Sequence, residues 1–372
     1  MLVQGKNYRT IWLKEDNDKI VQVIDQQLLP HKFVIRDLIS SAEVVLAIKN
    51  MTVRGAGLIG VAAAHGMYLA SLEAAESDNF TDYIERIASD LRLARPTAVN
   101  LSWAVERQQK IMDKGNSVEE KITLAKSTAQ EIANEDASFC QLIGVAGVKL
   151  IEDISKQKQG DVVNVLTHCN AGWLAFTDFG SATAPIYEAV KKGIKVHVWV
   201  DETRPRNQGA KLTAWELLNN NVPHTIIADN TGGHLMQNGL VDMVITGADR
   251  VTRMGDVANK IGTYLKALAA KDNSIPFYVA FPSSTLDWQT SDAKAEIKIE
   301  ERSGDEVKYV EGLMDNKLTK VLITPAESPA VNYAFDITPS RLITALITER
   351  GICEASEPAL LGLYPKESSI ND

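Results

Sequence analysis

The stretch VVNVLTHCNAGWLA at residues 162–175 marks the point where the sequence changes from a helical to a strand-rich pattern. Its first half is an apolar, β-branched run typical of a strand, and it ends abruptly in small and polar residues. Similar runs recur further along, with helix-like segments between them: IKVHVWV at 194–200, HTIIAD at 224–229, MVITGAD at 243–249, PFYVAF at 276–281 and KVLITP at 320–325. Strands that alternate with helices predict βαβ units and a parallel sheet covered on both faces.

The first third of the chain has a helical pattern instead. Apolar residues recur at three- and four-residue spacing in three segments: 36–51, 57–76 and 82–94. Another helix is expected to begin near Pro96, since proline suits the first turn of a helix. A long helical stretch from Val118 to Glu152 follows, and we expect breaks near Gly144 and Gly147.

These two patterns define the predicted fold class, which is α/β. We expect a helix-rich N-terminal domain over residues 1–130, followed by a Rossmann-like, doubly wound parallel-sheet domain over residues 131–372.

Composition limits the possible functions. The net charge of −9 argues against nucleic acid as a partner, because a phosphate backbone requires a basic face. The three cysteines form no CxxC pair and the six histidines show no ligand spacing, so we expect no metal. No apolar stretch reaches membrane-spanning length and the start lacks a signal core, which favours a cytoplasmic chain with no membrane contact.

Polar residues collect where the predicted strands end, which is where parallel sheets bind ligands. Cys169 ends the first run. Most free cysteines are small buried hydrophobes, but this one has Asn170 and Gly172 as neighbours, and a helix starting nearby would lower the pKa of its thiol. His168, next to it, points to the opposite side and is expected to be structural.

Asp249 follows another strand and has two readings. It is either a turn or cap residue, or a buried general acid whose pKa is raised by burial or by a neighbouring carboxylate such as Asp256. Asp256 could equally cap a following helix. Gln208, before a glycine, and Asn259-Lys260, at an expected helix start, would bring amides and a cation to the same edge.

The N-terminal half adds two basic residues at expected helix starts. Arg54 precedes Gly55 and Ala56 in TVRGAGLIG, a glycine-rich turn that lacks the Walker lysine and the dinucleotide spacing. Arg95 is the second, and each is either an anion donor or a surface charge.

Several ordered blocks resemble the methylthioribose-1-phosphate isomerase family, which is related to ribose-1,5-bisphosphate isomerases and to regulatory subunits of the guanine-exchange factor of translation initiation. The blocks are RGAxxIGVAAAHG, RPTAVNL, THCNAG, DETRPRNQGAKLTAWEL, GADRVTRMGDVANKIGTY, IEER and AFDITPSRLITALITERG, and the similarity runs from about residue 8 to about 364. The resemblance implies an aldose–ketose isomerase that acts on a pentose 1-phosphate, forms homodimers, and uses no metal or organic cofactor.

The resemblance also implies roles for individual residues. It makes Asp249 the proton donor and Cys169 the residue that assists the transition state. It places the substrate on seven further positions: Arg54, Gly55, Ala56, Arg95, Gln208, Asn259 and Lys260.

Some residues depart from the family pattern beside the implied site: Gly57, Leu58, Trp173, Phe176, Phe281 and Ser283. As a hypothesis, they change the pocket for the substituent on the fifth carbon, so 5-deoxyribose 1-phosphate or ribose 1,5-bisphosphate become alternative substrates. A regulatory binding protein without turnover is a further alternative, and a nicotinamide dehydrogenase is disfavoured because THCNAGWLAF lacks the glycine fingerprint.

Overall fold

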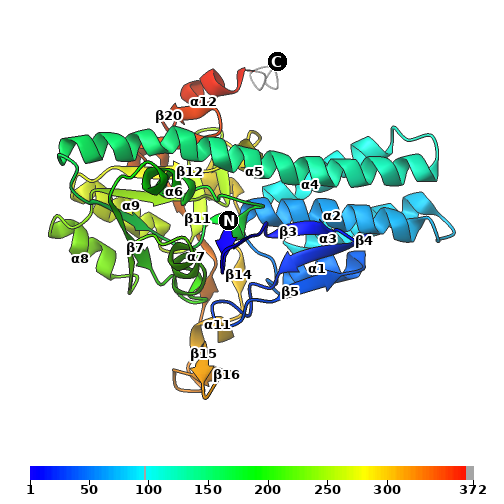
Figure 1. The fold of residues 1–372 in the computed structure, drawn as a ribbon, viewed down its shortest axis with the longest axis horizontal. Coiled ribbons are helices and arrows are strands. Elements are labelled where there is room, and N and C mark those ends of the chain that lie inside the picture. Colours follow the sequence, from blue (N-terminus) through cyan, green and yellow to red (C-terminus); the bar gives the residue numbers. More distant parts are fainter. Residues whose placement is uncertain (96–97, 366–372) are drawn as a thin grey trace.

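The N-terminal lobe combines helices with a small sheet. The computed structural model describes residues 1–95 and 98–365, so Pro96 and the helix start expected there lie outside the described residues. A three-stranded antiparallel sheet packs beside four helices (Figure 1): β3 (Ile11–Lys14), β4 (Asn17–Ile24), β5 (Ile35–Leu38), α1 (Ser41–Lys49), α2 (Ala56–Ala74), α3 (Phe80–Ala94) and α4 (Val99–Met112). Helix α2 is apolar nearly all round and buried, which fixes the turn that carries Arg54 at its start.

The second lobe confirms the Rossmann-like prediction. Its seven-stranded sheet has the order β20-β19-β12-β9-β6-β7-β8, and every pairing is parallel except that of β20. The strands are β6 (Val163–Thr167), β7 (Val196–Asp201), β8 (His224–Ile227), β9 (Met243–Thr246), β12 (Phe277–Ala280), β19 (Ala345–Thr348) and β20 (Gly351–Cys353). In chain order the six parallel strands run 3-2-1-4-5-6, the doubly wound arrangement of dinucleotide-binding folds.

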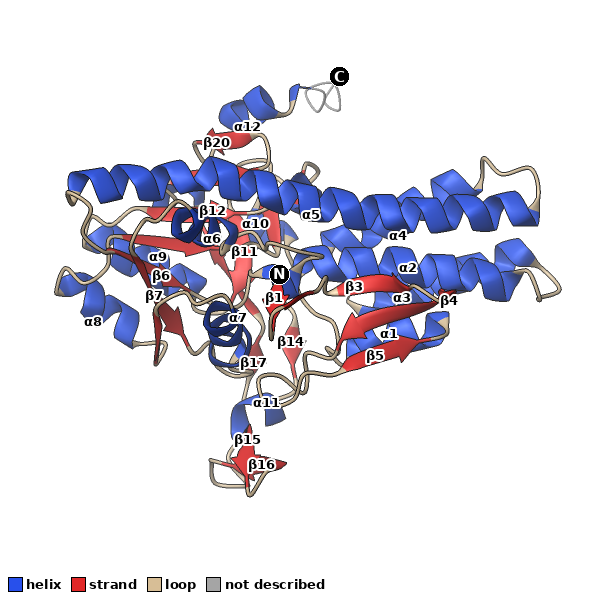
Figure 2. Cartoon of the chain, in the orientation of Figure 1, coloured by secondary structure: helices blue, strands red, loops and turns tan. Residues whose placement is uncertain are grey.

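Helices cover both faces of this sheet (Figure 2). On one side α6 (Ala184–Lys191) lies under α5 (Val118–Gln157), and on the other α8 (Thr231–Gln237) packs against α9 (Thr263–Asp272). Helix α7 (Ala214–Asn219) continues a short π-helical turn, Gly209–Thr213, and contacts β8. None of the helices within 1–95 and 98–365 is both long and apolar enough to cross a membrane.

Helix α5 (Val118–Gln157) runs unbroken for 40 residues along both lobes (Figure 1), so the expected breaks at Gly144 and Gly147 are wrong. These glycines serve close packing instead. A Cβ on Gly144 would lie 3.1 Å from the Cβ of Ala184, and one on Gly147 would lie 2.6 Å from Cγ of Pro185. The predicted domain boundary at 130/131 falls inside this helix and stays a prediction.

A second sheet follows β9 and was not expected from the sequence. Its order is β13-β10-β11-β18, formed by Leu286–Asp287, Arg250–Thr252, Val257–Lys260 and Phe335–Thr338. Asn259 and Lys260 therefore end a strand rather than begin a helix, and α9 starts only at Thr263. Asp256 does not cap the helix expected after it, because strand β11 follows instead; its carboxylate accepts from the backbone N–H of Ser340, the first residue of a short 3₁₀ turn, at 2.8 Å.

The run KVLITP lies at the end of an antiparallel hairpin, not in the parallel sheet. Strands β15 (Tyr309–Met314) and β16 (Lys317–Leu322) project from the second lobe (Figure 2). The remaining elements are short: β1 (Leu2–Val3), β2 (Lys6–Asn7), α10 (Ala293–Glu296), β14 (Glu301–Arg302), α11 (Asp305–Lys308), β17 (Asn332–Tyr333) and α12 (Glu357–Leu363). Strand β14 carries part of the IEER motif and pairs with β17.

Candidate active site

The strand order reverses between β6 and β9, which are neighbours in the sheet although three strands apart in the chain. The chain leaves β6 toward β7 and leaves β9 toward β12, in opposite directions across the sheet. Such a switch point opens a crevice at the carboxyl ends of the two strands. Cys169 follows β6 and Asp249 follows β9, so the topology places one on each side of this crevice.

Cys169 is buried and its backbone is strained. Its φ of +65° is unusual for a residue with a side chain, and its backbone is held by Thr203 and Thr213 at 2.8 and 2.7 Å. The thiol donates to Oε1 of Gln208 at 3.2 Å, which brings together two of the residues singled out in the sequence. The backbone at this position thus fixes where the sulfur points.

The expected helix at Cys169 is absent from the described structure. Only a short 3₁₀ turn, Trp173–Ala175, lies close behind it, and α6 begins at Ala184. Burial therefore raises the pKa of the Cys169 thiol, although the nearby charges of Arg54 and Lys260 act in the opposite direction. The prediction of a lowered thiol pKa is wrong, because desolvation outweighs the nearby cations.

Asp249 is followed by strand β10 rather than by a helix, so the cap interpretation does not hold. Its backbone N–H donates to the carbonyl of Ala258 at 3.0 Å. The carboxyl group borders a hollow, yet surrounding protein desolvates it, and this burial raises its pKa against the opposing charges of Lys260, Arg95 and Arg54. The raised pKa favours a proton on the carboxyl group, as a general acid requires.

Arg54 is the most firmly held of the three cations around this pair. Its guanidinium donates to the side-chain and backbone oxygens of Asn170, the residue after Cys169. Gly55 has a φ of +100°, and a Cβ there would lie 2.4 Å from Cα of Ala175. Only glycine therefore allows the start of α2 to approach the Cys169 loop.

The other two cations come from different elements. Nη2 of Arg95 lies 3.3 Å from a carboxylate oxygen of Glu300, and Nζ of Lys260 lies 4.6 Å from the centre of the Phe335 ring. Asn259, next to Lys260 on β11, donates to the hydroxyl of Thr263 at 3.0 Å.

Two hollows flank these residues. One has Arg54 and Gln208 in its wall, with polar neighbours such as Gln27 and Lys211. The other has Arg95 and Asp249 together with an apolar group: Ala56, Ile59, Ala98, Ala258, Ile297 and Phe335. The site therefore combines an acid, a thiol and cations with one apolar wall, which suits a small ligand that is anionic at one end.

Glu216 is a component of the site that the sequence did not reveal. It accepts hydrogen bonds from Asn170 (2.9 Å) and from the backbone N–H groups of Leu174 (3.0 Å) and Trp173 (3.1 Å). Burial raises its pKa to about 7. Through its hydrogen bond to Asn170, Glu216 orients Arg54. Its only signal in the sequence was a carboxylate within the apolar pattern of TAWELL.

The residues that depart from the family pattern lie mainly in the core. Trp173 packs beside Trp215, Phe176 lies in a cluster with Cys140, and Phe281 is fully buried in the sheet core. The two hollows described above have other linings. The altered-pocket hypothesis therefore stays a prediction.

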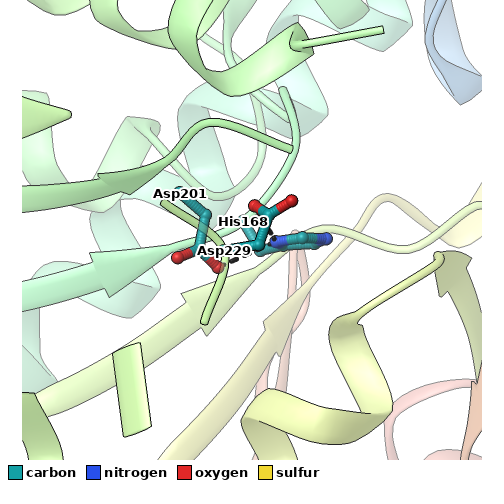
Figure 3. Close-up of side chains that lie close together, drawn as sticks. All are labelled: His168, Asp201 and Asp229. Atoms are coloured by element: carbon teal, nitrogen blue, oxygen red, sulfur yellow. Dashed lines mark hydrogen bonds and ion pairs between the residues drawn. The ribbon is translucent and has the colours of Figure 1, made fainter. Parts of the chain in front are cut away.

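His168, Asp201 and Asp229 lie close enough together to suggest a metal site (Figure 3). Protein groups already fill it, however. Nδ1 of His168 contacts Asp201 at 2.8 Å and Nε2 contacts the carbonyl of Ile261 at 2.8 Å, while the ammonium of Lys266 lies 3.1 Å from Asp201. These contacts make a buried hydrogen-bonded cluster next to Cys169 in the chain, which agrees with the structural role expected of His168.

Fold and geometry together define an α/β protein whose Rossmann-like switch point is lined by a thiol, a carboxyl group and cations. The model of the Initiation factor 2 subunit family matches residues 52–355. The methylthioribose-1-phosphate isomerase of Desulfatibacillum aliphaticivorans is 56% identical over 98% of this chain and 99% of its own. That of Sinorhizobium medicae is 52% identical over 99% and 100%.

Solved structures agree with these relatives. A 5-methylthioribose 1-phosphate isomerase from Pyrococcus horikoshii OT3 has a TM-score of 0.82 and 38% identity over 97% of each chain. A chain described as translation initiation factor eIF-2B, subunit delta, from A. fulgidus has a TM-score of 0.78 and 38% identity, over 96% of this chain and all of its own. The chain belongs to the methylthioribose-1-phosphate isomerase family, within the wider Initiation factor 2 subunit family.

Proposed function

We propose that this chain is an aldose–ketose isomerase that converts 5-methylthioribose 1-phosphate to 5-methylthioribulose 1-phosphate, a step of methionine salvage. The names of relatives that match it over almost its whole length support this activity. One structural observation carries the proposal. A thiol and a carboxyl group flank the switch point, and three cations surround them.

The substrate poses a chemical problem that this site suits. A phosphate ester on the anomeric carbon locks the sugar ring, so the enzyme itself must open it. Asp249 protonates the ring oxygen, and the bond between that oxygen and the first carbon breaks. Burial raises the pKa of Asp249 and so keeps a larger fraction of it protonated for this step.

Hydrogen must then move from the second carbon to the first. Cys169 rests as a neutral thiol, because burial raises its pKa and its S–H donates a hydrogen bond to Gln208. A neutral thiol is not available as a base. We therefore propose a hydride shift, with the neutral thiol packed against the migrating hydrogen in a site shielded from water. The hydroxyl on the second carbon loses its proton to the Asp249 carboxylate, which leaves a ketone and restores the acid.

The remaining groups hold the two ends of the substrate. The phosphate must stay attached, so Arg54, Arg95 and Lys260 clamp it without activating it as a leaving group. We place Gly55, Ala56, Gln208 and Asn259 in contact with the sugar and phosphate. The methylthio group lies against the apolar wall that contains Ile59 and Phe335.

A direct assay tests the proposed function. Purified protein is incubated with 5-methylthioribose 1-phosphate, 5-deoxyribose 1-phosphate and ribose 1,5-bisphosphate, and ketose formation is followed for each. We expect the highest kcat/KM for the methylthio sugar, because an apolar wall stabilises an apolar substituent by about 0.8 kcal/mol per buried methylene-sized group. A higher value for 5-deoxyribose 1-phosphate would instead support the altered-pocket hypothesis. No turnover of any of the three would favour a regulatory binding protein.

We also propose that the protein is a cytoplasmic homodimer. Its three cysteines are free thiols, which suits a reducing compartment. Light scattering tests the dimer, since the chain mass is 40.7 kDa and a dimer has twice this value.

A further inference from the structure

Arg95 and Glu300 form an unusually incomplete pair. Nη2 of Arg95 lies 3.3 Å from Oε2 of Glu300, and both side chains are largely buried, at 10% and 18% exposure. Within the described part of the chain, Nε of Arg95 and Oε2 of Glu300 find no hydrogen-bond partner. An open N–H on a largely buried charged group is costly, so the Nε–H of Arg95 points to an anionic ligand that completes it.

Glu300 belongs to the IEER motif and is held in place without Arg95. Its other oxygen accepts from Nη1 of Arg302 at 2.9 Å. Arg302 is fixed in turn by Glu306, which also pairs with Arg206 at 3.0 Å, two residues before Gln208. Burial alone would raise the pKa of Glu306, but Arg302 and Arg206 lower it to about 2, so the two arginines hold Glu306 as a carboxylate.

Arg95 has no such anchor. In the described residues, Glu300 is the one acidic side chain within 4.0 Å of its guanidinium. Arg54 differs sharply, since two of its nitrogens are bonded to Asn170. Arg95 borders the hollow that contains Asp249, whereas Arg54 borders the neighbouring hollow with Gln208. A phosphate held between the two hollows would therefore meet one fixed arginine and one that is held only by a carboxylate.

We propose that Glu300 is a counter-ion that holds Arg95 in the free protein. When the substrate binds, its phosphate takes the place of Glu300 on the Arg95 guanidinium. A doubly charged phosphate offers Arg95 a bidentate partner and fills its open Nε–H. Glu300 stays behind on Arg302, close enough to repel the bound anion. Glu300 is thus a positioning residue that sets phosphate affinity through Arg95.

This inference rests on the proposed function, because it takes the bound anion to be a phosphate ester. It predicts that ligand affinity rises when Glu300 is lost, whereas a merely structural role predicts that affinity falls. Loss of a structural residue weakens ligand binding, whereas loss of a competing counter-ion strengthens it. Glu300→Gln is the suitable change, because an amide oxygen can still accept from Arg302 while the competing charge is gone.

Titration calorimetry with inorganic phosphate at fixed ionic strength provides the test, and it requires no turnover. We expect Glu300→Gln to lower the phosphate Kd about three- to tenfold, about 0.7–1.4 kcal/mol, the range for removing one partly buried charge from an ion pair. Glu301→Gln is the matched control, because the side chain of Glu301, next to Glu300 in the chain, is exposed. This change should leave Kd unchanged. An unchanged or higher Kd in folded Glu300→Gln would overturn the proposal.

A second measurement uses the wild-type protein and so does not depend on the folding of a variant. In a crystal soaked with inorganic phosphate, we expect the Arg95 guanidinium to bind the anion and to leave Glu300, which remains on Arg302. A phosphate bound by Arg54 and Lys260 with Arg95 still on Glu300 would contradict it. If both phosphate results hold and the wild type turns over no pentose 1-phosphate, the counter-ion stands and the proposed function fails.

Discussion

Replacing Gly57 by alanine tests how the start of helix α2 is packed onto the site. A Cβ at position 57 would lie 2.3 Å from Cδ1 of Phe176 and 2.4 Å from a carboxylate oxygen of Asp136. Ordinary carbon contacts need about 3.5–4.0 Å, so the ring or the helix must move by more than about 1 Å. Phe176 is 3% exposed and packs against Cys140, which leaves it little room to turn away.

The size of the effect follows from two opposing contributions. Overpacking a filled core costs about 1–3 kcal/mol, while replacing a helical glycine by alanine contributes about 0.5–1 kcal/mol of stability. The contacts at Gly57 are so short that we expect Gly57→Ala to lower the free energy of unfolding by about 1–2 kcal/mol. Gly233 is the matched control, because it is also helical and its Cβ would meet nothing closer than 3.8 Å. Gly233→Ala should raise stability by about 0.5–1 kcal/mol.

Urea unfolding followed by fluorescence measures both variants. Adding Phe176→Leu to Gly57→Ala should recover about 1 kcal/mol, because residues in contact couple by about this amount. If Gly57→Ala is as stable as Gly233→Ala, the close packing of Gly57 on Phe176 is not what fixes the start of α2.

Three further predictions concern chemistry and charge. With substrate deuterated at the second carbon, a hydride shift keeps the label on the first carbon of the product, and mass spectrometry would show washout into solvent if a base removes it instead. Burial raises the pKa of Asp136 to about 7, so its contribution to stability is complete below about pH 4 and is lost as the pH rises through 7. The stability of wild type relative to Asp136→Asn should therefore fall by up to about 4 kcal/mol over that range in urea unfolding, and a constant gap would contradict this. Glu216→Gln presents an NH₂ group to donors, so it should destabilise the fold by about 1–3 kcal/mol and raise KM through Arg54, and an unchanged KM would refute the link.

The parallel sheet could be predicted from sequence because most of its strands form apolar, β-branched runs, and five of the six expected runs lie in it. Because parallel sheets bind ligands at the carboxyl ends of their strands, Cys169 and Asp249 could then be placed at one edge without any side-chain information. Three-dimensional packing decided the rest. Gly144 resembles a helix break until the tight contact with Ala184 is seen. Lys260 resembles a helix start because its strand is short and because Lys260 itself pairs with Phe335, a distant segment.

The pKa shifts and charged partners of the site residues could not be predicted from the sequence either. A helix start was expected to lower the pKa of Cys169, yet the chain places a 3₁₀ turn there and buries the sulfur. Glu216 and Glu300 contact the site through Asn170 and Arg95, and these pairings join segments more than 40 residues apart. Local sequence patterns carry no information on such contacts.

The proposed ring-opening mechanism is tested by comparing kcat of wild type, Asp249→Asn and Cys169→Ser with 5-methylthioribose 1-phosphate at neutral pH. We expect turnover by wild type and a loss of about 10²–10⁴-fold in Asp249→Asn, the usual contribution of a general acid. Cys169→Ser should also lose most activity while both variants keep the wild-type melting temperature. Wild-type turnover that persists undiminished in Asp249→Asn would contradict the assignment of this carboxyl group as the acid that opens the ring.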